Sequence, residues 1–71
     1  MRREFSVIIE KDEDGWFVGT VPELHGCHTQ AKSMDKLLVR VREAIELCLE
    51  VQKAPGPAHE FVGVQKVTVG T

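Results

Sequence analysis

Short runs of alternating apolar and polar residues open the chain. In residues 4–10 the apolar side chains fall at every second position, and these are Phe5, Val7 and Ile9. Because successive side chains of a strand point to opposite faces, this run predicts a β-strand with one face on a core. A second run, residues 16–21, follows Asp14-Gly15, which is typical of a hairpin turn. We therefore expect the two strands to pair antiparallel.

Two further segments are expected to be strands. Residues 27–30 follow a short loop bracketed by Pro22 and Gly26, and they are long enough for a third strand. Residues 61–69 are rich in valine, whose β-branched side chain suits a strand. The alternation of this last segment changes phase in the middle, which a bulge near residues 65–66 would reconcile.

The clearest predicted element is a helix that begins after Ser33. Apolar residues at helical spacing form one stripe, and these are Leu37, Leu38, Val41, Ala44, Ile45 and Cys48. Ser33 provides a capping oxygen, and Asp35 suits the positive end of the helix dipole. Because the loop at Pro55-Gly56-Pro57 cannot continue a helix, we expect the helix to end near Lys53.

The predicted order is β-β-β-α-β, in a single domain covering residues 1–71. One helix packed on one face of a mostly antiparallel sheet is an α+β architecture. A chain of 71 residues supports only one modest core. Self-association into a dimer or larger homo-oligomer is therefore expected to add stability.

Composition narrows the functional classes. The chain is 42% hydrophobic and 28% charged, which indicates a folded globular protein. Its 9 basic and 11 acidic residues give a net charge of -2, which argues against a dedicated nucleic-acid-binding domain and favours a basic protein partner. Two cysteines make no disulfide framework, and neither a signal peptide nor an apolar run of membrane-spanning length is seen. We expect a cytoplasmic protein with no membrane association.

Catalytic and metal-binding interpretations compete with simpler ones. A metal-dependent nuclease needs several converging carboxylates, and the candidates are Glu10, Glu43, Glu46 and Glu50. Acidic residues 12–14 lie in the hairpin turn, where such residues are ordinarily solvated. The cluster at His25, Cys27 and His28 has ligand-type side chains without a usual zinc spacing, and a free cysteine is usually a small buried hydrophobe. We expect no enzyme activity and no cofactor, while metal binding by this cluster stays open.

Candidate contact residues come from positions outside the predicted core. Trp16 and Phe17 are neighbours on a strand, so one should face the core and the other the uncovered sheet face. The pattern does not decide which of them does so. Val39 and Leu47 fall off the helix stripe, and they are either part of an interface with a second copy or simply exposed.

Three segments resemble the HicB antitoxin family, and together they cover most of the first 50 residues. They are residues 7–18, with the acidic turn before Gly15 and two aromatics; residues 21–30, with Val-Pro-Glu-Leu before Gly-Cys; and the amphipathic residues 43–50. The residues that match the structural part of the family motif are Asp14, Gly15, Pro22, Gly26 and Cys27. The chain departs from the family pattern at His25, where proline is usual.

The resemblance implies a fold and a function. The family core is similar to a degenerate ribonuclease H fold, is not known as an enzyme, and neutralises a HicA-type toxin, a small RNA-cleaving protein. Acidic residues such as Glu43, Glu46 and Glu50 would complement the basic face of that toxin. Family members commonly continue into a C-terminal DNA-binding domain, whereas this chain ends at Thr71, so direct DNA binding has little support.

Two other functions remain open. One is a stand-alone nucleic-acid-binding regulator, which would need a basic patch drawn from Arg2, Arg3, Lys36, Arg40 and Arg42. The other is a metal-dependent nuclease remnant. It is weakened because the last predicted strand carries no acidic residue.

Overall fold

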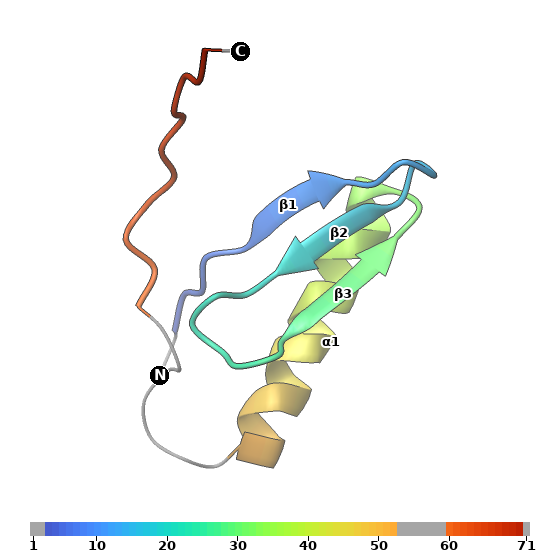
Figure 1. Cartoon of the computed structure of the whole chain (residues 1–71). Coiled ribbons are helices and arrows are strands. Elements are labelled where there is room, and N and C mark those ends of the chain that lie inside the picture. The colour runs from blue at the N-terminus through green and yellow to red at the C-terminus, as the bar shows by residue number, and fades with distance from the viewer. Residues whose placement is uncertain (1–2, 53–59, 71) are drawn as a thin grey trace.

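A three-stranded sheet and one helix form the body of the domain (Figure 1). The computed structural model describes residues 3–52 and 60–70. Its elements are β1 (Ile8–Lys11), β2 (Phe17–Thr20), β3 (His28–Ala31) and α1 (Met34–Gln52). The strands are antiparallel in the order β1-β2-β3, and α1 covers one face of the sheet (Figure 1). The predicted α+β class is confirmed in these three strands and the following helix.

The turn between β1 and β2 is held by one carboxylate. Oδ1 of Asp12 accepts hydrogen bonds from the backbone N–H groups of Asp14 and Trp16, both at 2.9 Å. Gly15 has a φ of +87°, which glycine adopts without steric cost. The predicted hairpin is confirmed, and its register places Lys11 opposite Phe17.

The loop between β2 and β3 folds back on itself. The N–H of Val21 donates to the carbonyl of Cys27 at 2.9 Å, and the N–H of Leu24 donates to the carbonyl of Val21 at 3.1 Å. Both oxygens of the Glu23 carboxylate accept from the N–H of Ser6, at 3.2 and 3.3 Å. The loop is thereby tied to the segment that leads into β1, and its apolar side chains turn inward.

Helix α1 begins as its sequence predicts. Oγ of Ser33 accepts a hydrogen bond from the N–H of Lys36 at 3.2 Å, and the carbonyl of Ser33 accepts one from Leu37 at 2.9 Å. This is the N-cap arrangement that satisfies free donors of the first turn. The helix is described through Gln52. Its predicted end near Lys53 and the loop at residues 55–57 lie outside the described residues.

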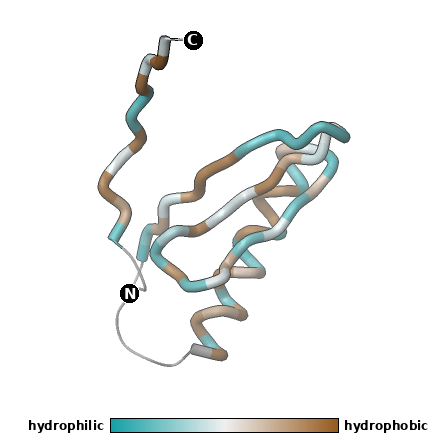
Figure 2. The backbone as a smooth tube through the Cα atoms, in the orientation of Figure 1, coloured by the Kyte–Doolittle hydropathy of each residue, from teal (hydrophilic) through white to brown (hydrophobic). Residues whose placement is uncertain are grey.

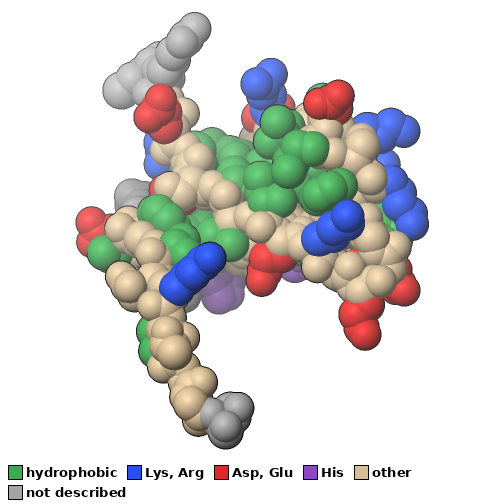
Figure 3. All heavy atoms as spheres, turned by 90° about the horizontal axis from the view of Figure 1, so that it is seen from above, with side chains coloured by type: hydrophobic (Ala, Val, Ile, Leu, Met, Phe, Trp, Pro, Cys, Tyr) green, Lys and Arg blue, Asp and Glu red, His purple; other side chains and the backbone are tan. Residues whose placement is uncertain are grey.

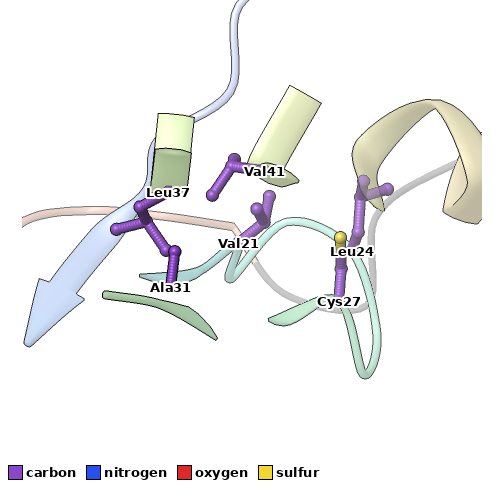
Figure 4. Close-up of a cluster of buried hydrophobic side chains, with 6 residues drawn as sticks. All are labelled: Val21, Leu24, Cys27, Ala31, Leu37 and Val41. Atoms are coloured by element: carbon purple, nitrogen blue, oxygen red, sulfur yellow. The ribbon is translucent and has the colours of Figure 1, made fainter. Parts of the chain in front are cut away.

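The core lies between α1 and the sheet. Six buried side chains from the helix, β3 and the loop before β3 meet there (Figure 4), namely Val21, Leu24, Cys27, Ala31, Leu37 and Val41. Gly19 of β2 allows the helix to approach, because a Cβ at this position would lie 3.0 Å from Cγ2 of Val41 and 3.3 Å from Cγ1 of Val7. A side chain here would push the helix away from the sheet.

The prediction that Leu38 belongs to the buried stripe is wrong. Its side chain is 51% exposed, whereas Leu49, which was not assigned to the stripe, packs against the core. At 100° per residue Leu38 lies on one flank of the helix rather than at its centre, together with Ile45 and Leu49. Ile45 and Leu49 are half-buried against the core, whereas no described strand or helix covers Leu38.

The prediction of a strand at residues 61–69 is also wrong. Residues 60–70 form neither strand nor helix, and they run away from the sheet as an extended segment (Figure 1). Apolar and polar residues still follow one another along the segment (Figure 2). Its four valines are 73–91% exposed. Valine favours strands only where a neighbouring strand and an apolar surface receive it, and no part of residues 3–52 supplies either to this segment.

Candidate protein-binding surface

The outer side of α1 carries a row of carboxylates. Glu43, Glu46 and Glu50 are spaced three and four residues apart, so they share the side of the helix opposite the buried Leu37 and Val41. All three are exposed, and none pairs with a basic side chain within residues 3–52 and 60–70. We refer to Glu43, Glu46 and Glu50 as the acidic ridge.

Two apolar residues accompany the acidic ridge. Val39 continues its line toward the start of the helix and is 59% exposed, and Leu47 lies beside it and is 61% exposed. Both residues were predicted to lie off the buried stripe, and the structure confirms this. Arg42 lines the same surface as Glu43 and Glu46. The ridge and its neighbours therefore present carboxylates, one guanidinium and apolar side chains together, a combination suited to a protein partner.

Two neighbouring aromatic residues, Trp16 just before β2 and Phe17 at its start, lie on opposite faces of the sheet. Phe17 packs against the core on the helix side, with Nζ of Lys11 at 5.4 Å from its ring centre. Trp16 precedes it and faces the other way, with Nζ of Lys32 at 4.5 Å from the ring centre. The structure thus assigns Phe17 to the core and Trp16 to the sheet face without a helix. The acidic ridge and Trp16 are on opposite sides of the molecule.

The carboxylates considered for a nuclease site do not converge. Glu10 is paired with Val18 and shares the sheet face that points away from α1. The acidic ridge lies beyond the helix on the other side. In the part of the chain that the structure describes, no group of three or more His, Cys, Asp and Glu side chains lies close enough to hold a metal ion.

The His25, Cys27 and His28 cluster is split by burial. Cys27 is 2% exposed and points into the core (Figure 4), whereas His25 and His28 are exposed. Cys27 of the loop and Cys48 of the helix lie near one another, and both thiols are free. Burial, assisted by the contact with Cys48, raises the pKa of Cys27 to about 12. Cys27 is therefore a packing residue and a poor nucleophile at neutral pH.

The described basic residues considered for nucleic-acid binding fall into two pairs, with Arg3 and Arg42 on one surface and Lys36 and Arg40 on another. The guanidinium of Arg3 lies 4.9 Å from the ring centre of Phe5. Nη1 of Arg40 donates to the carbonyl of Gln30 at 2.8 Å and ties α1 to β3. Arg2 lies outside the described residues. Two of the basic residues that would form a patch, Arg3 and Arg40, are thus engaged in contacts within the domain.

A groove that sequence analysis did not predict lies between α1 and the segment before β1. Its volume is about 550 Å³. Its floor is apolar and its rim is charged, and it is lined by Phe5, Leu38, Val41, Ile45, Leu49, Arg3, Arg42 and Glu46. We refer to it as the β1-side groove. The sequence does carry one signal for this groove. The apolar stripe of the helix is wider than the surface that one face of the sheet covers.

Comparisons with known proteins agree on one family. Residues 5–64 match the family described as "HicB_like antitoxin of bacterial toxin-antitoxin system". A UPF0150 protein of Archaeoglobus fulgidus is 60% identical over 68 residues, which cover 96% of this chain and 97% of that protein. UPF0150 proteins of Synechocystis and Thermotoga maritima are 47% and 35% identical, over 96% and 100% of this chain and 97% and 96% of theirs. Among the described residues, no helix is both long and apolar enough to cross a membrane.

Proposed function

Because this chain belongs to the HicB-like antitoxin family, we propose that it is a non-catalytic antitoxin that binds and masks a HicA-type RNA-cleaving toxin. The observation that carries the proposal beyond the family is the acidic ridge. An RNA-cleaving protein must present a basic surface to the phosphate backbone. The ridge offers such a surface three carboxylates that have no basic partner among the described residues.

The ridge would work by position and charge. Glu50 follows Glu43 by seven positions, so the row spans about 10 Å of helix at a rise of 1.5 Å per residue. Its negative charge would steer a basic toxin and speed association, and contacts with Val39 and Leu47 would slow dissociation. We further propose a single domain over residues 1–71 and a cytoplasmic location, since free thiols such as Cys27 and Cys48 persist in a reducing compartment.

The proposal is tested with the small protein encoded beside this chain. The two proteins are co-expressed and purified, and the chain is then titrated into an RNA-cleavage assay of its neighbour. A stable complex in which cleavage stops supports the proposal. Absence of a complex contradicts it, and binding of RNA or DNA by the chain alone would support a nucleic-acid regulator instead.

Charge reversal locates the contact. In the triple variant Glu43→Lys, Glu46→Lys and Glu50→Lys, we expect toxin affinity at least about tenfold weaker, mainly through slower association. The matched control reverses three exposed glutamates away from the ridge, Glu4, Glu10 and Glu60, and changes net charge equally. An equal loss of affinity in both triple variants would show that only overall charge matters and would remove the ridge from the proposal.

A further inference from the structure

Strand β1 has a free edge beside an uncovered apolar surface. It pairs with β2 on one side, and no described element pairs with it on the other. Ile9 is opposite Gly19 and shares its helix-facing side, yet it remains 39% exposed. The β1-side groove continues this apolar surface from Phe5 to the flank of α1. The space beside β1 therefore has the open edge and the apolar lining that a further strand requires.

The extended C-terminal segment has the properties of such a strand. Residues 61–69 contain no proline, so every backbone N–H can donate to a ladder. The valines at positions 62, 64, 67 and 69 are 91%, 77%, 78% and 73% exposed, although valine is among the residues most often buried. Figure 3, which views the molecule from above, also shows this segment projecting away from the body of the domain. The segment is thus extended and apolar, and its valines have no packing partner among the described residues.

The apolar pattern of the segment favours a second copy as the host. Val62 and Val64 occupy one phase of the alternation, and Val67 and Val69 occupy the other. A strand with apolar residues on both faces is typically buried on both. The β1-side groove covers one face only, so the other needs an apolar layer from outside the chain. A two-copy assembly supplies that layer, and it also enlarges the small core of the domain.

We propose that residues 61–69 of one copy lie alongside the free edge of β1 in a second copy and insert valines into its β1-side groove. The exchange is reciprocal, as in a two-fold dimer in which each copy gives and receives the same segment. The proposal concerns self-assembly and stands independently of toxin binding.

The first test uses the unmodified chain. Light scattering after size-exclusion chromatography gives the molar mass, and hydrogen exchange followed by NMR gives the protection of each amide. We expect a dimer in which the amides of residues 62–69 and of the outer edge of β1 are protected. A monomer overturns the proposal, including a monomer with protected amides, which would show pairing within one chain. A dimer with unprotected amides at residues 62–69 overturns it as well.

The second test removes the inserted valines. In the double variant Val64→Lys and Val67→Lys, we expect the dissociation constant of the dimer to rise at least about 100-fold. Each buried valine contributes roughly a tenfold change in affinity or more. The matched control is Met34→Lys with Val51→Lys on α1, where the side chains are 39% and 71% exposed and lie outside both the groove and the acidic ridge. We expect the control to remain dimeric.

Folding and function are measured separately in these variants. Both substituted positions in the segment are at least 77% exposed in the single chain, so the domain should keep its circular dichroism spectrum. If Val64→Lys with Val67→Lys remains a dimer, the interface lies elsewhere and the proposal fails. Inhibition of the toxin is assayed on the same samples, so loss of self-assembly and loss of toxin binding are distinguished.

Discussion

The carboxylate of Asp12 holds the hairpin turn through two backbone hydrogen bonds, to Asp14 and to Trp16. Asp14 supplies only its backbone N–H to this arrangement, although the Asp-Gly dipeptide is the stronger sequence signal. A short acidic side chain that bonds to N–H groups two residues on is a common way to hold a turn. The residue that stabilises the turn is therefore two positions before the one that the motif emphasises.

Substitutions of Asp12 and Asp14 should show which of the two side chains stabilises the turn. We expect Asp12→Ala to lower the free energy of unfolding by about 1 kcal/mol, because two backbone donors lose their acceptor at a solvent-exposed site. Asp14→Ala, which leaves both bonds in place, should change it by less than about 0.5 kcal/mol. Urea denaturation of the two variants measures the difference, and equal losses would contradict the assignment.

Cys27 should make stability depend on alkaline pH. Its pKa is raised from 9.0 to about 12 by burial and by Cys48, so the folded chain keeps a proton that the unfolded chain releases. The contribution of the Cys27 thiol to the free energy of unfolding is complete below pH 9. It is lost as pH rises from 9 toward 12, and the free energy of unfolding then falls by at most about 1.4 kcal/mol per pH unit. Denaturation of the chain and of Cys27→Ala at several pH values should show a shallower slope in the variant. Identical slopes would contradict this prediction.

At the scale of elements, one side of α1 packs against the core and the opposite side is exposed to solvent. Leu37 is fully buried against the sheet, whereas Leu47 is 61% exposed near the acidic ridge. A Ser33 cap starts the helix, and the Arg40 contact with Gln30 anchors it to β3. A leucine on the core side of α1 therefore contributes more to the stability of the fold than a leucine on the exposed side.

A pair of leucine truncations measures that difference. We expect Leu37→Ala to cost about 2–5 kcal/mol of stability, through lost burial and the cavity left behind. Leu47→Ala should stay within about 0.5 kcal/mol, as usual for surface positions. Thermal or urea unfolding compares them directly. A large loss for Leu47→Ala in a single chain would indicate a contact that the described residues do not show.

At the scale of the whole molecule, the surfaces proposed for the toxin and for self-assembly meet at one residue. Glu46 belongs to the acidic ridge and also lines the rim of the β1-side groove. The groove faces the free edge of β1, and the ridge faces away from the core. A partner on the ridge and a strand in the groove would therefore approach each other at Glu46, where their contacts can influence one another.

Local patterns in the sequence were sufficient for much of this fold. Alternation and the Asp-Gly dipeptide predicted the β1–β2 hairpin, and helical spacing with Ser33 predicted α1 and its start. The antiparallel α+β arrangement and the exposure of Val39 and Leu47 followed from the same patterns. These features depend on periodicity and on interactions within a few residues, which a sequence displays directly. The acidic ridge was visible in the same way, as glutamates three and four positions apart.

Other features were decided only by tertiary structure. These are the choice of Phe17 over Trp16 for the core, the contact between Cys27 and Cys48, the exposure of Leu38 and the unpaired state of residues 61–69. Each depends on which surface lies opposite a residue, and that surface comes from a distant part of the chain. The valines of residues 61–69 carry the pattern of a strand, but a strand forms only where an edge with free N–H and carbonyl groups receives it. Sequence by itself determined the propensity of this segment, and tertiary structure decided that its own sheet does not use it.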